Sequence, residues 1–133
     1  EYIQPYHARL IEIAKAFHQP VMYHSDGAMY PLIPELIDLG VDVLNPLQPN
    51  AKDMEPERLK SEFGDRLAFH GGIDILNTLP NGSTQNVADE VCERIAVLGE
   101  NGGYILASSH HIQPNTPLEN ILEMYRLDHR RRL

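Results

Sequence analysis

The sequence contains a single cysteine, Cys92, and lacks the long apolar runs of membrane proteins. One cysteine excludes a disulfide within the chain and is compatible with a reducing compartment. No apolar run approaches the roughly 18 residues of a membrane span, and no signal peptide is visible. The motifs of P-loop, dinucleotide-binding, nucleophile-elbow and CxxC proteins are also missing. We therefore expect a cytoplasmic protein with no membrane partner.

Basic residues are few, with 11 Lys and Arg against 19 Asp and Glu and a formal charge of −8. A negative surface repels nucleic acids and anionic membranes, so neither is expected as a partner. The basic run Arg130–Arg132 is expected to be the solvated tail of a helix. Residues 1–133 suit one domain, and the start at Glu1 within a helical pattern suggests part of a longer protein.

Helical and strand patterns alternate along the chain. The expected strands are 21–26, 41–45, 66–70 and 104–107; the expected helices are 2–17, 31–39, 55–63, 84–99 and one from 117, with a loop at 75–83. Such alternation predicts an α/β fold with a parallel sheet, in which about four βα units follow a first helix. These units make a small open sheet or half of an eight-stranded barrel. Unpaired outer strands would then need a second copy of the chain or a missing N-terminal half.

The first and last helices show the apolar spacing of amphipathic helices. In the first helix an apolar stripe is expected from Ile3, Tyr6, Leu10, Ile13 and Phe17. In the last, Thr116 to Glu119 reads as a capping box, and the residues expected to point inward are Leu118, Ile121, Leu122 and Tyr125.

Polar residues follow each expected strand, where parallel α/β folds place their ligand sites. They are His24 and Asp26, then Asn45 and Gln48, then His70 and Asp74, and finally Ser109, His110 and His111. We expect these side chains to share one rim and to include the groups that bind a substrate. The pattern predicts the location of a site and leaves its reaction open.

His24 and Asp26 alternate on a strand and can form one edge of a metal site, with His110 as the best third ligand and Gln48 as a weak fourth. A hydrogen-bonded pair that only supports the loop is the alternative. His70 precedes Gly71 and Gly72, where missing side chains would let a ligand approach the backbone. The alternative is that His70 packs at the strand end.

Six stretches resemble the uroporphyrinogen decarboxylase superfamily, in order along the chain. They are His24–Gly27, Gly40–Pro46, Phe63–Leu67, Gly71–Asp74, Gly103–Leu106 and Pro114–Ile121. The resemblance implies a (β/α)8 TIM barrel, of which this chain would be the C-terminal half.

The superfamily contains two main chemistries. Uroporphyrinogen decarboxylase removes acetate carboxyl groups from a tetrapyrrole, in porphyrin biosynthesis, without a metal or organic cofactor. The resemblance implies that its key Arg and Asp lie in an N-terminal segment outside this chain. It also implies catalytic roles for Asp26 and His110, although Ser109 and His111 stand where that enzyme has glycines.

Corrinoid-dependent methyltransferases are the second group and bind Zn²⁺ through a His-x-Cys motif and a later Cys. His24 matches their His, whereas Asp26 and, approximately, His110 stand at their cysteines. A carboxylate and imidazoles form a harder ligand set than thiolates, so a Zn²⁺ or other divalent site would have a changed character.

Three hypotheses follow for the function. The first is a fragment of a decarboxylase-like enzyme, inactive alone, whose catalytic groups are His24, Asp26 and His110. The second is a metal-dependent methyltransferase-type site on the same residues, acting with a corrinoid-type molecule. The third is a non-catalytic half barrel that acts by pairing with another half.

Overall fold

The computed structural model describes residues 2–126, so the tail at Arg130–Arg132 lies outside the described residues. Its strands are β1 (Met22–His24), β2 (Val43–Leu47), β3 (Ala68–Ile73) and β4 (Tyr104–Ser108). Its helices are α1 (Gln4–Ala16), the 3-10 turn η1 (Tyr30–Leu32), α2 (Ile33–Leu39), α3 (Pro56–Phe63), α4 (Thr78–Asn81), α5 (Thr84–Leu98) and α6 (Leu118–Met124).

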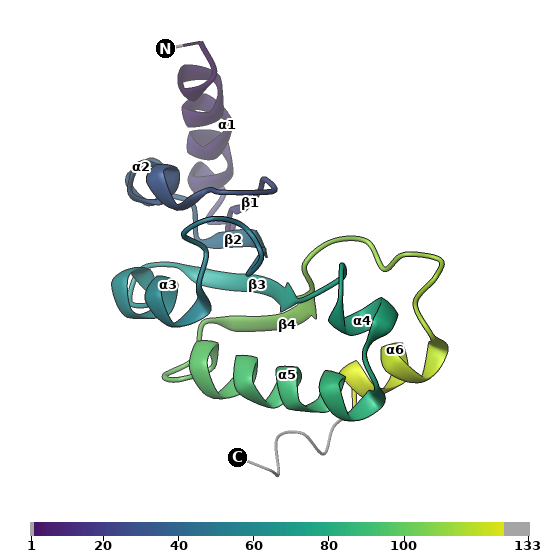
Figure 1. Ribbon diagram of the computed structural model, residues 1–133. Coiled ribbons are helices and arrows are strands. Elements are labelled where there is room, and N and C mark those ends of the chain that lie inside the picture. Colours follow the sequence, from purple (N-terminus) through teal and green to yellow (C-terminus); the bar gives the residue numbers. More distant parts are fainter. Residues whose placement is uncertain (1, 127–133) are drawn as a thin grey trace.

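The four strands form one parallel sheet in the order β1-β2-β3-β4. A helix connects each strand to the next, and α5 runs along the sheet beside β3 and β4 (Figure 1). The predicted α/β class is confirmed, and the arrangement is consistent with part of a TIM barrel. Within residues 2–126 no helix is long and apolar enough to cross a membrane.

One face of the sheet is covered by helices and carries the core. Leu44 and Phe69, which are register partners, are fully buried there, and α2 and α3 contribute Ile33 and Leu59 to the same cluster. A second cluster joins the end of β3 to α4, α5 and α6. The expected helix 84–99 is confirmed as α5, which begins with a capping box between Ser83 and Asn86.

The opposite face of the sheet is far less covered. Register and alternation place Met22, Val43 and Ala68 side by side on this face. Met22 is 49% exposed and Ile105, on the same face of β4, is 44% exposed. The backbone edges of β1 and β4 have no strand partner among the described residues.

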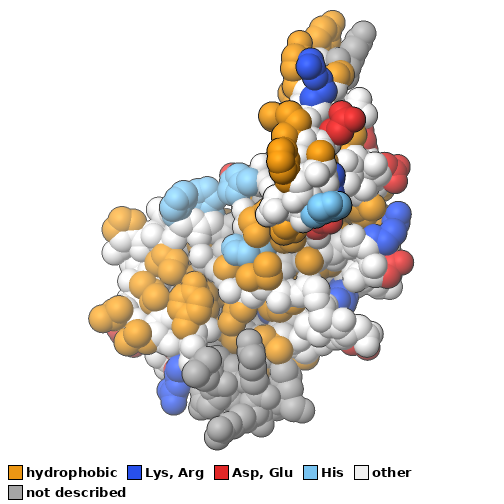
Figure 2. Space-filling view, turned by 180° about the vertical axis from the view of Figure 1, so that it is seen from behind, with side chains coloured by type: hydrophobic (Ala, Val, Ile, Leu, Met, Phe, Trp, Pro, Cys, Tyr) orange, Lys and Arg blue, Asp and Glu red, His pale blue; other side chains and the backbone are white. Residues whose placement is uncertain are grey.

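The expected first helix is present as α1, but its apolar stripe is exposed. Side chains of the stripe are 58–72% exposed, and Ile11 is the one residue of α1 that is buried. Helix α1 stands out from the rest of the fold (Figure 1), with hydrophobic side chains along it (Figure 2). The apolar spacing correctly predicted a helix here, but nothing in the described residues covers its apolar face.

The prediction that the apolar residues of the last helix point inward is wrong for most of them. Leu118, Leu122 and Tyr125 are 54–66% exposed, whereas the buried residues are Asn120, Glu123 and Met124. The expected capping box is absent, because the helix begins after Pro117 with no side-chain cap. The expected loop 75–83 contains a short helix, α4, whose Leu79 is fully buried.

Candidate functional site

A hollow of about 240 Å³ lies at the carboxyl ends of the strands, and we call it the histidine pocket. All four strands contribute to it directly or through the residues that follow them. The lining residues are His24, Asn45, Pro46, His70, Ala107, Ser108, Ser109, His110 and His111. Six of these residues were predicted from the sequence to share one rim. Pro46, Ala107 and Ser108 were not predicted as site residues.

Asp26 lies between two histidines at the mouth of this pocket. Its Oδ2 is 3.9 Å from Nε2 of His24 and 3.8 Å from Nε2 of His110. One ligand atom from each of the three residues lies within 4.8 Å of the others. Their side chains are 59%, 52% and 37% exposed for His24, Asp26 and His110, so the cluster is open to solvent. Two imidazoles and one carboxylate are a ligand set that catalytic zinc sites use.

Asn45 joins two histidines of neighbouring strands. It is the register partner of His24, and its Oδ1 lies 2.6 Å from the Nδ1 of that residue. Its Nδ2 lies 2.5 Å from Nδ1 of His70 on the next strand. Asn45 thus uses both ends of its amide within the pocket, and its predicted contact with a substrate stays a prediction.

Gln48 supports the site from outside the pocket lining. Its Oε1 accepts a hydrogen bond of 2.9 Å from the backbone N–H of Gly27. Gly27 has φ of +84°, a left-handed conformation that favours glycine, and it ends the turn that carries Asp26. Gln48 therefore fixes the turn, while a direct role in ligand binding stays a prediction.

The residues after β4 form the other wall of the pocket. His111 and His110 approach each other with their Nδ1 atoms 3.1 Å apart. Ser109 is 2% exposed, and its hydroxyl donates to the carbonyl of Ile73 at 2.7 Å. Its buried hydroxyl fastens this wall to the end of β3, which keeps His110 facing Asp26.

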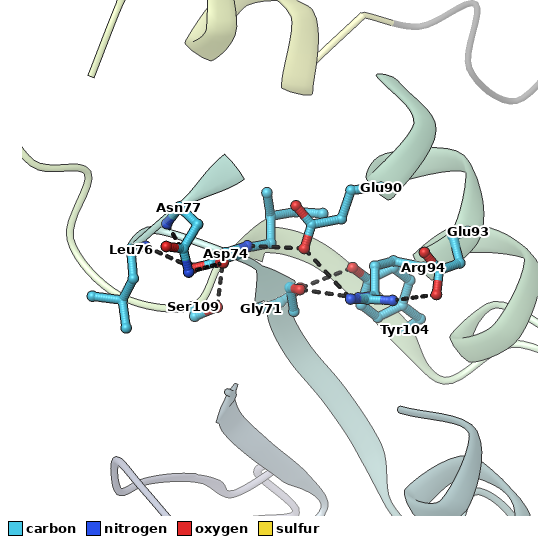
Figure 3. A network of polar contacts seen from close by, with 11 residues as sticks. Gly71, Asp74, Leu76, Asn77, Glu90, Glu93, Arg94, Tyr104 and Ser109 are labelled. Atoms are coloured by element: carbon cyan, nitrogen blue, oxygen red, sulfur yellow. Dashed lines mark hydrogen bonds and ion pairs between the residues drawn. The ribbon is translucent and has the colours of Figure 1, made fainter. Parts of the chain in front are cut away.

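Asp74 lies apart from the histidine pocket and lines a separate hollow with Glu90 and Arg94. Its carboxylate accepts hydrogen bonds from the backbone N–H groups of Leu76 and Asn77 and from the side chain of Asn77 (Figure 3). Burial alone would raise the pKa of Asp74, but these hydrogen bonds outweigh it and the pKa is lowered. The carboxylate caps a turn, and its predicted contact with a substrate stays a prediction.

The glycines after His70 are closely packed by protein, contrary to the expectation of space for a ligand. A Cβ on Gly71 would lie 3.2 Å from the backbone N of Leu47, and one on Gly72 would lie 3.2 Å from the Tyr104 hydroxyl. That hydroxyl donates to the Gly71 carbonyl at 2.8 Å (Figure 3), and its burial raises the pKa of Tyr104. The absent side chains make room for the chain itself.

The ionisable groups at the pocket are its histidines and, at its mouth, Asp26. Within the part of the chain that the structure describes, no Lys or Arg side chain lines the pocket. A ligand carrying several carboxylates would therefore find hydrogen-bond donors here but no permanent positive charge.

Comparison with models of protein families matches residues 1–131 to the family described as uroporphyrinogen decarboxylase (URO-D). No curated protein matches the chain.

Proposed function

The chain belongs to the uroporphyrinogen decarboxylase family, and on that premise we propose that it supplies half of the substrate site of a cytoplasmic, decarboxylase-like enzyme acting on a tetrapyrrole. The observation that carries this proposal is the convergence of polar side chains from all four strands on the histidine pocket. Ligand sites of TIM barrels lie at this end of the strands.

The size of the pocket supports a partial site. Its volume of about 240 Å³ is below the ~300–1,000 Å³ of ordinary small-molecule pockets. A tetrapyrrole is a large molecule, so the pocket suits one pyrrole ring and its acidic arm. Further walls and cations must then come from outside the described residues.

In this proposal Asp26 accepts a hydrogen bond from a pyrrole N–H, and a histidine supplies a proton. The bond between an acetate methylene and its carboxylate breaks, CO2 leaves, and the methylene carbon takes up a proton to become a methyl group. His110 or His24, when protonated, can donate that proton as a general acid. Oδ2 of Asp26 lies 3.8–3.9 Å from Nε2 of both imidazoles, so the carboxylate and the two candidate acids face the same point at the mouth of the pocket.

The experiment measures binding and turnover separately. Isothermal titration calorimetry with uroporphyrinogen under anaerobic conditions is expected to show weaker binding for Asp26→Ala and His110→Ala than for the wild type. His18→Ala is the matched control, because His18 is exposed at the end of α1 and outside the pocket. Product chromatography is expected to show no decarboxylation by the isolated chain, since no Lys or Arg among residues 2–126 lines the pocket. Equal binding by all variants, or turnover by the isolated chain, contradicts the proposal.

A second candidate, a metal-dependent methyltransferase-type site for a corrinoid-type partner, is favoured by the His24, Asp26 and His110 cluster. The donor set fits Zn²⁺ or another divalent ion. Oδ1 of Asn45 lies against Nδ1 of His24, and metal-ligating histidines almost always make such a hydrogen bond through the ring nitrogen that does not bind the metal. A bound ion would supply Lewis-acid activation of a methyl acceptor. Metal analysis of protein purified without chelators tests this candidate. Stoichiometric metal that is lost in His24→Ala but kept in His18→Ala supports it, and metal-free wild type refutes it.

A further inference from the structure

We infer that Asn45 is a positioning residue that fixes opposite tautomers on His24 and His70. An amide oxygen accepts hydrogen bonds only, and an amide nitrogen donates only. Because Oδ1 of Asn45 faces Nδ1 of His24 at 2.6 Å, that nitrogen must carry the proton. Because Nδ2 faces Nδ1 of His70 at 2.5 Å, that nitrogen must be bare.

In the neutral ring, a proton on Nδ1 of His24 leaves its Nε2 bare. This atom is the one that lies 3.9 Å from Asp26 and belongs to the cluster with His110. An imidazole binds a cation or accepts a proton through its unprotonated nitrogen. Asn45 therefore presents the lone pair of His24 to the mouth of the pocket.

The consequence for His70 is the reverse. With Nδ1 bare, the neutral ring carries its proton on Nε2 and can donate only from that atom. The pair of histidines thus offers one acceptor and one donor, whereas two unrestrained rings would exchange tautomers independently. This arrangement matches a ligand in which a cation or N–H group binds the acceptor nitrogen of His24 and an oxygen accepts the N–H of His70.

The role of the two tautomers in ligand binding rests on the proposed function. The tautomers themselves are measured without a ligand, so they are tested independently of that function. Two-bond proton–nitrogen correlation spectra of the uniformly labelled chain distinguish the tautomers at about pH 8.5, where an ordinary imidazole is neutral. We expect the wild type to show His24 protonated at Nδ1 and His70 at Nε2. A wild-type spectrum with His24 protonated at Nε2 overturns the inference.

Asn45→Asp makes the test sharper, because a carboxylate accepts at both oxygens. We expect His24 to keep its tautomer and His70 to switch to a proton on Nδ1. Asn115→Asp is the matched control, since it adds the same charge at an exposed loop position and should leave both rings unchanged. If His70 does not switch in a folded Asn45→Asp chain, the amide does not set the tautomers and the inference fails.

Metal titration separates this inference from the metal-site candidate. If the wild type binds Zn²⁺, Asn45→Ala is expected to weaken binding about 10- to 100-fold, the usual effect of losing such an outer hydrogen bond. Unchanged Zn²⁺ affinity in Asn45→Ala overturns the positioning role. A wild type that binds no Zn²⁺ but shows the expected tautomers refutes the metal site alone and supports the role of Asn45.

Discussion

Replacing Asp42 with Asn should loosen the strand that carries His24, and the loss should depend on pH. The carboxylate of Asp42 is 2.6 Å from Nζ of Lys15 through each oxygen, and one oxygen also accepts the backbone N–H of Val21 at 2.6 Å. Lys15 belongs to α1, and Val21 directly precedes β1. One side chain therefore joins α1 and β1 to the start of β2.

The magnitude follows from exposure and from the number of bonds. Lys15 and Asp42 side chains are 38% and 40% exposed, so their ion pair contributes only about 0.5–1 kcal/mol after solvent screening. The bond from Val21 to a charged group adds about 1 kcal/mol. Asn keeps the shape and one acceptor but loses the charge. We therefore expect Asp42→Asn to lower the free energy of unfolding by about 1–2 kcal/mol at pH 7.

The sign of the pH dependence follows from the lowered pKa of Asp42. Burial acts to raise this pKa, but the hydrogen bonds from Lys15 and Val21 outweigh it. A lowered folded-state pKa stabilises the protein above the unfolded-state value, about 3.9 for Asp. This stabilisation is lost as pH falls through the folded-state pKa. The difference between wild type and Asp42→Asn should therefore shrink in acid.

Urea unfolding followed by circular dichroism at a series of pH values measures this difference. Asp38→Asn is the control, because Asp38 is an exposed residue of α2, and its substitution should change the unfolding free energy by less than about 0.5 kcal/mol. A difference between wild type and Asp42→Asn that stays constant from neutral to strongly acidic pH would refute the reasoning. So would an equal effect of Asp38→Asn.

Three further predictions concern packing and buried polar groups. Burial raises the pKa of Glu90. The stabilisation that the protonated side chain contributes is therefore complete below the ordinary carboxyl pKa and is lost as pH rises through the folded-state pKa. In denaturant unfolding, the free energy of unfolding of Glu90→Gln should equal that of the wild type near pH 4 and be higher than that of the wild type at pH 8. Asn120 is 2% exposed and donates to two backbone carbonyls, so thermal or urea unfolding of Asn120→Ala should show a loss of about 2–3 kcal/mol. Ile13→Lys should alter stability by less than about 0.5 kcal/mol, because Ile13 is 58% exposed. Ile33→Ala, at a fully buried site, should cost about 2–5 kcal/mol in the same assay; equal losses at the two positions would contradict the exposure of α1.

The sequence predicted the strand and helix order because each element has a clear apolar period and a Gly or Pro boundary. Helix α5 agrees with its prediction because Val87, Val91 and Leu98 pack against β3 and β4. Helices α1 and α6 have equally clear periods, but a period shows only that a face is apolar. What covers the face depends on the neighbouring elements, and for these two helices the described residues provide no cover.

The location of the site was also predictable, whereas its internal contacts were not. Polar residues at strand ends meet at one rim in any parallel sheet. The bridge from His24 through Asn45 to His70 depends on the register of three strands, which sequence spacing does not define. Asp74 illustrates the limit, because a polar residue after a strand can turn back to cap its own loop.

The helices at the two outer strands restrict how a barrel could close. Along the chain α1 precedes β1 and α6 follows β4, so both outer strands are followed or preceded by a helix of this chain. A (β/α)8 barrel has one helix for each junction between neighbouring strands. Two copies of this chain would bring α1 of one copy and α6 of the other to the same junction, with two helices competing for one position. A complementary unit of four strands and three helices meets no such competition.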